Sequence, residues 1–297
     1  MADDDRAESA DADAVAVAER VLDAVAGVAP DVRAGLPGRR RYLDSENPSG
    51  EAVLAADAFA DDEIEAALAA VEGVGAYASE ERESVVDVGD GRVSVAVDPL
   101  DGSSNLESNN PMGTVVAVYD GDLPAPGRDL VGAGFVLYGP VTTMVAGVGA
   151  PDEATVREYL VEDGEREAVE TVELPREPTV YGVGGRVPDW PDPVAAYVDE
   201  VEDELKLRYG GAMIADVSQV LSYGGVFAYP TLASSPAGKL RLQFEGNPVA
   251  YLIEGADGRS SDGERSLLDV SATDLHQRVP VYVGNAGLIE RLESTLP

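Results

Sequence analysis

The order of apolar and polar positions divides the chain into two halves of different character. In the first half, Ala/Val-rich stretches predict one helix over residues 9–29, ending before Pro30, and one or two over residues 51–72, with Asp61 and Asp62 as an internal N-cap. After Gly73, short β-branched runs separated by Gly, Pro and Asp predict strands instead. The predicted strands are Val93–Val97, Thr114–Tyr119, Leu130–Leu137, Val141–Val145, Tyr159–Val161 and Thr171–Leu174.

In the second half, predicted helices and strands alternate along the chain. Strands are expected at Thr179–Val183, Val226–Tyr229, Leu240–Phe244 and Val279–Val283, and helices near Val194–Leu205, Met213–Leu221, Pro248–Ala256 and Leu288–Leu296. This change of pattern predicts a boundary near residue 174, between an N-terminal α+β domain (1–174) and a C-terminal α/β domain (175–297).

Charge excludes several classes of function. Among 297 residues, 56 are acidic and 21 basic, which gives a formal net charge of −35. A field of this sign repels nucleic acid and anionic membrane surfaces, so neither is expected as a partner.

No apolar run approaches the 18 or so residues that span a bilayer, and the polar start MADDDRAESA does not resemble a signal peptide. With no cysteine in the chain, thiol catalysis is excluded, and the cytoplasm is the expected compartment.

The acidic residues are spread along the chain, and lysine is nearly absent. Only Lys206 and Lys239 occur, and the other 19 basic residues are arginines. This composition is typical of cytoplasmic proteins from extreme halophiles, whose surface carboxylates keep them dispersed in concentrated salt. Most carboxylates are therefore expected to be solvated surface groups.

The segment from Val95 to Asn105 has a different pattern. An apolar strand delivers Asp98 at its carboxyl end, Pro99 stops the strand, and Asp101-Gly102 begins a turn. Two carboxylates three residues apart on a tight turn can bind one hard cation, and oxygen ligands favour magnesium or manganese. The following Gly102-Ser103-Ser104 offers backbone N–H groups and hydroxyls to a phosphate. A capped Asx-turn would account for Asp101 and Ser103 but leaves Asp98-Pro99 unexplained.

Two further segments carry related chemistry. Glu80 and Glu81 follow an apolar run, and a hairpin-like excursion then returns the chain to the strand of Asp98, so both loops could share a sheet edge. Here Glu80 would bind metal and Glu81 would activate water. Between Lys239 and Glu245, alternation predicts a strand with Lys239, Arg241 and Gln243 on one face, either for an anionic ligand or for a structural salt bridge, and Glu245 at its end.

Together, Ser79-Glu80-Glu81, Asp98–Asn105 and Gly238–Glu254 resemble class I fructose-1,6-bisphosphatase, within the lithium-sensitive superfamily that includes inositol monophosphatase. The likeness extends over most of residues 45–260 and includes Arg208–Val217 and Ser222–Pro230. It implies a layered α/β/α/β/α fold and magnesium-dependent hydrolysis of the 1-phosphate of fructose 1,6-bisphosphate, a gluconeogenic reaction. Two or three magnesium ions, or manganese, are implied at each active site.

The resemblance also assigns roles by position. The implied metal ligands are Glu80, Asp98, the Leu100 carbonyl, Asp101, Glu245 and, for a weaker ion, Glu51. Asp57 and Glu81 would activate the nucleophilic water. Asp101, Gly102, Ser103 and Ser104 would hold the scissile phosphate, and Lys239, Tyr209 and Tyr229 the sugar and 6-phosphate. Arg208 would reach the 6-phosphate bound to a neighbouring subunit, which implies a homo-oligomer, usually a tetramer in this family.

Two alternatives stay open. The family's 6-phosphate ligands in one stretch are here replaced by Tyr181-Gly-Val-Gly-Gly185, which leaves inositol monophosphate or a nucleotide phosphate as substrates of the same chemistry. A non-catalytic acidic protein that binds divalent cations through its surface is also compatible with the composition.

Overall fold

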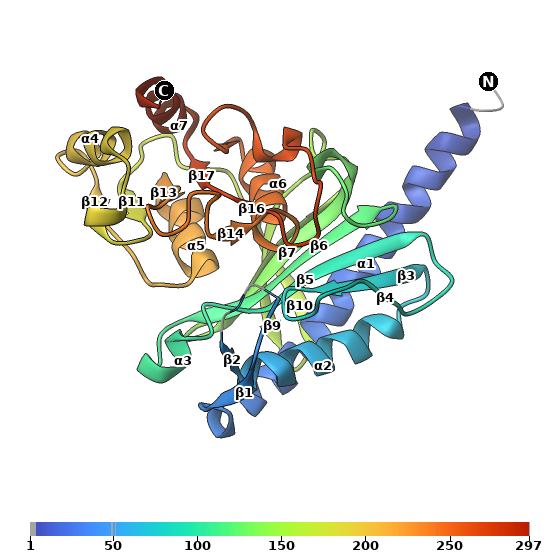
Figure 1. Ribbon diagram of the computed structural model, residues 1–297. Coiled ribbons are helices and arrows are strands. Elements are labelled where there is room, and N and C mark those ends of the chain that lie inside the picture. The colour runs from blue at the N-terminus through green and yellow to red at the C-terminus, as the bar shows by residue number, and fades with distance from the viewer. Residues whose placement is uncertain (1–3, 49, 51, 297) are drawn as a thin grey trace.

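The computed structural model describes residues 4–48, 50 and 52–296. Five layers stack in the order α/β/α/β/α, as predicted (Figure 1). The outer layers are α1 with α2 on one side and α4 with α7 on the other, and α5 with α6 lies between the two sheets. The helices are α1 (Asp4–Gly35), α2 (Ala55–Ala69), α3 (Asn105–Ser108), α4 (Asp192–Val201), α5 (Met213–Tyr223), α6 (Asn247–Gly255) and α7 (Ala286–Thr295).

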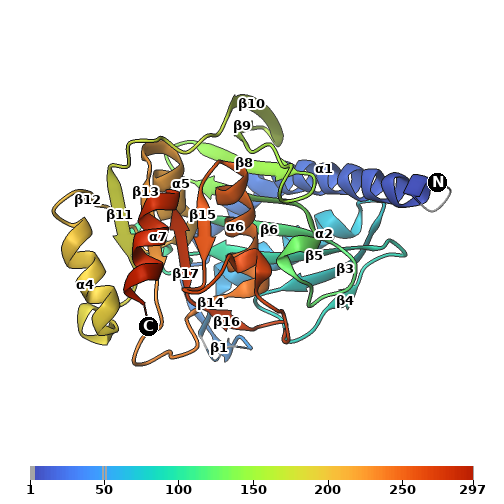
Figure 2. The ribbon, with the colours of Figure 1, turned by 90° about the horizontal axis from the view of Figure 1, so that it is seen from above.

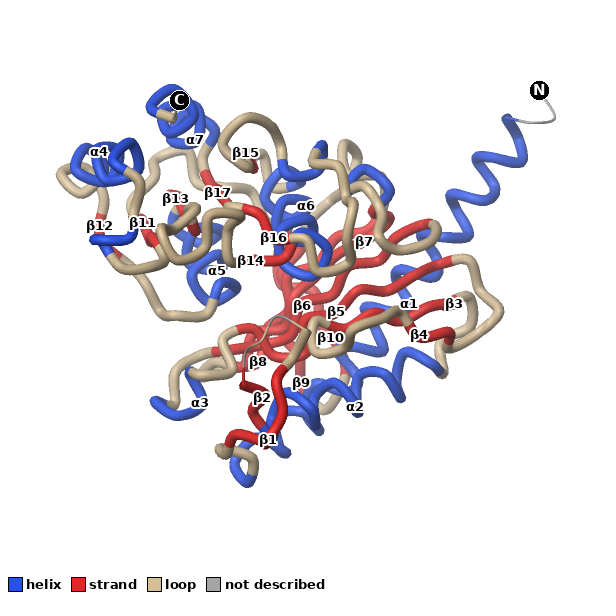
Figure 3. Tube along the Cα trace, in the orientation of Figure 1, coloured by secondary structure: helices blue, strands red, loops and turns tan. Residues whose placement is uncertain are grey.

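The larger sheet has eight strands in the order β10-β9-β8-β7-β6-β5-β3-β4. Its central strands are buried on both faces: Val116 and Val118 face α1 and α2, while Val115 and Ala117 face α5 and α6. Figure 3 shows these strands between the two helix layers. Their bounds are β3 (Val74–Ser79), β4 (Val86–Asp87), β5 (Val93–Asp101), β6 (Met112–Asp120), β7 (Leu130–Tyr138), β8 (Thr142–Val148), β9 (Arg157–Glu162) and β10 (Glu165–Thr171).

The smaller sheet has five strands in the order β12-β11-β13-β17-β15. These strands are β11 (Val180–Val183), β12 (Lys206–Leu207), β13 (Gly225–Tyr229), β15 (Arg259–Ser261) and β17 (Val281–Gly284). Two short pairs complete the fold: β1 (Tyr42–Glu46) with β2 (Ala52–Leu54), and β14 (Leu240–Arg241) with β16 (Arg278–Val279). Within the described residues, no helix is long and apolar enough to cross a bilayer.

Adjacent strands β3 and β5 run parallel, although the segment that joins them is short. The chain leaves β3, pairs back along its outer edge as β4, and crosses the start of β3 to enter β5. A Cβ atom on Gly75 would lie 1.9 Å from the carbonyl oxygen of Gly91, so this crossing requires glycine. The crossing places the carboxyl ends of β3 and β5 side by side.

Several predicted elements were wrong in their limits. Helix α1 continues through Pro30 to Gly35, although the proline cannot donate to the carbonyl of Ala26, because Val32 extends the buried face of the helix beyond it. Its N-terminal end extends past the sheet (Figures 1 and 2). The strand predicted at Thr171–Leu174 is instead Glu165–Thr171, and the chain beyond it crosses toward the second sheet, where Leu174 N donates to Ala256 O.

Residues 52–69 form a short strand and one helix, rather than one or two helices. Asp61 is not an N-cap: it lies buried within α2 and accepts hydrogen bonds from the Tyr77 hydroxyl (2.7 Å) and Arg82 Nε (2.5 Å). The N-cap of α2 is Leu54, and Asp57, at the third position of the helix, accepts from Leu54 N through its Oδ2 at 2.8 Å. This bond fixes Asp57 at the start of the helix.

Candidate active site

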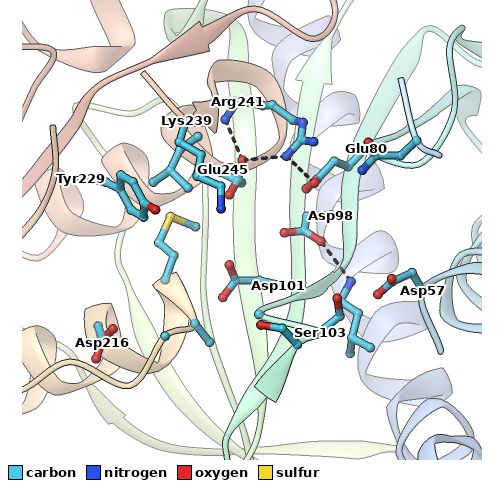
Figure 4. A pocket seen from close by; sticks show the side chains of 18 of the residues that line it. Asp57, Glu80, Asp98, Asp101, Ser103, Asp216, Tyr229, Lys239, Arg241 and Glu245 are labelled. Carbon is cyan, nitrogen blue, oxygen red and sulfur yellow. Dashed lines mark hydrogen bonds and ion pairs between the residues drawn. The ribbon is translucent and has the colours of Figure 1, made fainter. Parts of the chain in front are cut away.

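Three buried carboxylates gather where the sheet meets the central helix layer. Each of Glu80, Asp98 and Glu245 offers a carboxylate oxygen, and these oxygens lie within 4.8 Å of one another. Glu80 follows β3, and Asp98 lies near the end of the neighbouring parallel strand β5 (Figure 4). Glu80 N donates to Val97 O at 3.0 Å, which continues the strand pairing into the site. As the sequence predicted, the two loops share a sheet edge.

Glu245 reaches the cluster through a turn that the sequence did not predict. The expected strand Leu240–Phe244 ends at Arg241, and Leu242–Gly246 forms a π-helical turn into α6. Gln243 therefore does not share a face with Lys239 and Arg241. Its buried amide instead bonds both the N–H and the C=O of Ala125, each at 2.8 Å. A buried amide gains more from these two backbone partners than from a position on the expected strand face.

Arg241 is a buried cation inside the cluster. Its Nη1 forms an ion pair with Glu80 Oε1 and lies 3.8 Å from Glu245 Oε2, and its backbone N donates to the same Glu245 oxygen at 2.6 Å. Of the two interpretations of the arginine, the structure therefore favours the structural salt bridge. Lys239, two residues earlier, is exposed and lines the cavity.

The cluster holds more negative charge than one guanidinium can balance. Burial and the charge of neighbouring carboxylates raise the pKa values of Asp98 and Glu245 well above their ordinary range, and Arg241 opposes both shifts. Burial, opposed by hydrogen bonds from Ile214 and Met213, raises the pKa of Asp101 to about 7. Buried oxygen donors with raised pKa values fit a hard divalent cation, which would relieve their mutual repulsion.

The turn after β5 forms the floor of the cavity. Asp101 Oδ2 accepts from Ile214 N, at the start of α5, at 2.9 Å, and Leu100 N donates to Asp98 Oδ1 at 3.0 Å. Gly102 has φ +72°, and a Cβ there would lie 2.2 Å from the Cβ of Ala212, so the turn needs glycine for both reasons. Ser103 and Ser104 follow on the cavity wall, before the one-turn helix α3.

Asp57 and Glu81 line the same cavity, on the side that is formed by the N-terminal half of the chain. Burial, with the charges of Asp57 and Glu80, raises the pKa of Glu81 to about 8, and a hydrogen bond with Asn47 opposes the shift. Glu81 Oε2 is buried and has no hydrogen-bond partner among the described residues. A carboxylate with this pKa, beside a cation-binding cluster, is suited to accept a proton from water.

The cavity has a volume of about 290 Å³, and its other end is lined by Tyr209, Tyr229 and Lys239. The structure thus brings these residues together with Glu80, Glu81, Asp57, Asp98, Leu100, Glu245 and residues 101–104. It does not bring in Arg208, which is exposed and does not line the cavity of this chain. Glu51 lies outside the described residues.

Sequence reasoning missed three polar residues that line the cavity. Asn47 comes from the loop between β1 and β2, Tyr42 from β1, and Asp216 from the first turns of α5. Burial raises the pKa of Asp216 to about 6, against hydrogen bonds from the backbone of Gly210 and Gly211. The local pattern of α5 gave no signal for Asp216, because an isolated acidic residue is ordinary in so acidic a chain.

A cation-binding carboxylate cluster beside a glycine-serine turn, enclosed between two mixed α/β layers, is the arrangement of a metal-dependent phosphatase. Comparison with known proteins gives the family. Residues 12–165 match the N-terminal domain of fructose-1,6-bisphosphatase, and residues 174–297 match its C-terminal domain. The chain belongs to the class 1 fructose-1,6-bisphosphatase family.

Similar proteins come from halophilic archaea and beyond. A class 1 fructose-1,6-bisphosphatase of Halobacterium salinarum is 58% identical over 284 residues, which cover 95% of this chain and 98% of the relative. One from Natronomonas pharaonis is 56% identical, covering 93% and 98%. The crystal structure of Leishmania major fructose-1,6-bisphosphatase in holo form has a TM-score of 0.85 at 26% identity, covering 94% of this chain and 93% of that one.

Proposed function

We propose that this protein hydrolyses the 1-phosphate of fructose 1,6-bisphosphate, giving fructose 6-phosphate and inorganic phosphate, with magnesium as its cofactor. The observation that carries the proposal is the cluster of Glu80, Asp98 and Glu245, with Glu81 beside it at a pKa of about 8. These groups adjoin the Asp101–Ser104 turn within one cavity.

Each group has a role in the reaction. The backbone and hydroxyls of Gly102, Ser103 and Ser104 would hold the scissile phosphate. Glu81, with Asp57 near it, would take a proton from the attacking water, whose oxygen displaces the sugar oxygen at phosphorus. Tyr209, Tyr229 and Lys239 would bind the sugar and its second phosphate. Bound magnesium would neutralise charge on the phosphate and lower the pKa of the water.

We propose two or three magnesium ions per site, with manganese able to replace them. Their ligands would be Glu80, Asp98, the Leu100 carbonyl, Asp101 and Glu245, with Glu51 for a weaker ion. An all-oxygen set of this kind suits hard divalent cations and disfavours zinc. Isothermal titration of the metal-free protein with magnesium and then manganese would count the ions.

We also propose a homotetramer of two-domain chains in the cytoplasm. Arg208 is exposed directly after β12, which supports a role in a neighbouring subunit's site. The two sheets lie on either side of the proposed boundary near residue 174, in support of domains 1–174 and 175–297. Light scattering in molar salt tests the subunit number, and loss of turnover in Arg208→Ala tests the contribution in trans.

The decisive experiment measures phosphate release in molar salt with magnesium. Fructose 1,6-bisphosphate, inositol 1-phosphate and 3′-phosphoadenosine 5′-phosphate are compared by kcat/KM. A clear preference for the sugar bisphosphate supports the proposal. A preference for inositol 1-phosphate or the nucleotide would transfer the same chemistry to another substrate, and no release from any of them, with the fold intact, would contradict it.

A further inference from the structure

Asp216 is a buried carboxylate that the proposed mechanism does not use. It is 2% exposed and lies in the first turns of α5, on the same side of the pocket as Tyr229 and apart from Glu80 and Asp98 (Figure 4). Its Oδ1 accepts a hydrogen bond from Gly210 N at 2.7 Å, and Gly211 N contributes a second backbone bond. Its Oδ2 is buried without a partner among the described residues.

Asn105 binds the carbonyl of the first of these two glycines. Its Nδ2 donates to Gly210 O and to Pro111 O, both at 2.9 Å, and the side chain is buried. Gly211 has φ +83°, and a Cβ there would lie 3.2 Å from Asn105 Oδ1. The Gly210-Gly211 segment is therefore fixed between α5, through Asp216, and the residue that begins α3.

This segment carries the residues assigned to the sugar-phosphate end of the cavity. Tyr209 precedes it directly, lines the cavity and is 46% exposed, so packing alone restrains its ring only in part. Arg208 comes one residue earlier and is anchored by its backbone N to Tyr181 O at 2.8 Å. Without these bonds, two consecutive glycines would leave the backbone next to Tyr209 with wide conformational freedom.

We propose that Asp216 is a positioning residue for sugar-phosphate recognition: by bonding the Gly210 and Gly211 amides, it fixes the backbone that presents Tyr209 and Arg208. The inference rests on the proposed function. Asp216 is not itself a ligand of the substrate, because its Oδ1 accepts from Gly210 N and from Gln219 Nε2 (3.4 Å), its Oδ2 is buried, and a carboxylate repels phosphate.

Its effect should be separable from metal binding. Asp101 accepts from Ile214 N in the first turn of α5, where amides have no partner within the helix. This turn is closed by the backbone bond from Asp216 N to Ala212 O (3.2 Å), which a change of the Asp216 side chain leaves in place. Loss of the Asp216 carboxylate should therefore loosen residues 209–211 while leaving the Asp101 anchor in place.

Three variants test the proposal in the full-length protein. Asp216→Ala should raise KM for fructose 1,6-bisphosphate by about 3- to 10-fold, the change expected from one or two lost hydrogen bonds. Both kcat and the magnesium concentration for half-activation should change by less than about twofold. Asp216→Asn keeps an oxygen that can accept from the same amides, so it should restore most of the KM. Ser222→Ala, on the same helix, removes only a bond to Ser218 O and is the control.

A readout independent of turnover is amide hydrogen exchange followed by mass spectrometry. In Asp216→Ala, exchange should accelerate in peptides covering 208–211 and stay unchanged in those covering 213–223. Asn105→Ala removes the hydrogen bond to Gly210 O, so it should also raise KM and accelerate exchange of 208–211. This variant tests the proposal even if Asp216→Ala fails to fold.

An unchanged KM in Asn105→Ala, or in a folded Asp216→Ala, would contradict the proposal. So would a change in Asp216→Ala that is confined to kcat or to the magnesium concentration for half-activation, because the effect would then lie at Asp101. The wild-type protein separates this failure from that of the proposed function, because a protein that releases no phosphate contradicts the function itself.

Discussion

The two ends of the cavity are built by different means. At the metal end, Glu80 and Asp98 extend from adjacent parallel strands, so the backbone pairing of the sheet fixes their separation. At the sugar end, Tyr209 and Lys239 lie on loops and are exposed. The sheet thus pre-organises the carboxylate cluster within one chain, whereas we propose that substrate recognition depends on a loop clamp and on a second subunit.

The two ends also differ in charge. The metal end gathers buried carboxylates around Arg241, and their pKa values are raised by burial and mutual repulsion. The sugar end presents Lys239, one of only two lysines in the chain. Several buried carboxylates therefore repel one another at the first end until cations bind, whereas the second end presents a cation. Four experiments test this difference between the two ends of the cavity.

The largest effect is expected from Asp98→Asn. Loss of a ligand from the cluster should lower kcat on the order of a thousandfold, since cation stabilisation of the transition state is worth several kcal/mol. The melting temperature of the metal-free protein should not fall, because the change removes a repelling charge. Phosphate release and calorimetry check both, with the exposed Asp90→Asn as control. A near-normal rate would remove Asp98 from the mechanism.

Arg241→Met should destabilise the fold. Removing the cation from a buried ion pair typically lowers the free energy of unfolding by about 3–5 kcal/mol, because Glu80 and Glu245 stay buried. Denaturant titration without divalent cations measures the loss, and added magnesium should recover part of it. Arg186→Met, whose pair with Asp189 involves a side chain 82% exposed, should cost about 1 kcal/mol or less. Equal losses would contradict the contrast between buried cluster and open surface.

Lys239→Met should affect binding more than turnover. Loss of one charge-assisted contact to a phosphate should raise KM about tenfold while kcat changes little. The matched control is Lys206→Met, which removes the other lysine from the exposed strand β12, outside the cavity. If both substitutions raise KM equally, overall charge and not the position of Lys239 is responsible.

The fourth prediction concerns how the stability of the metal-free protein depends on pH. The pKa of Glu81 rises from 4.5 to about 8 on folding, so between these values the folded state binds more protons than the unfolded state. The stabilisation from protonated Glu81 is complete below pH 4.5 and is lost as pH rises through about 8. Melting temperatures measured with a chelator should therefore decline over this interval, and less steeply in Glu81→Gln. Identical slopes would show that Glu81 is not the group responsible.

Local pattern was sufficient for much of the fold and of the site. Strand-end placement of Asp98, the turn at Asp101-Gly102 and the Glu80-Glu81 pair could each be identified from neighbouring residues, because they depend on a few residues in a row. The pairing of β3 with β5 then brought Glu80 and Asp98 together as expected. The boundary near residue 174 and the assigned roles stay predictions.

Other features depended on contacts between distant segments. The expected strand through Gln243 failed because Ala125, more than a hundred residues away, supplies two backbone partners to its amide. The helix expected to end before Pro30 continues because its apolar face is buried on the sheet. The position of Asp216 in the cavity could not be predicted, because its side chain binds the loop at Gly210 and loops have no periodic sequence pattern.

Residue type and short-range spacing were enough to predict mixed α and β elements in two halves, the acidic surface and carboxylates at strand ends, whereas the layered fold was implied by the family resemblance. Only the tertiary structure decided that Arg241 pairs with Glu80, that the pKa of Glu81 is raised, and that Asp216 binds Gly210. Those outcomes depend on burial and on distances between groups far apart in the chain, and electrostatic and hydrogen-bond energies change steeply with both.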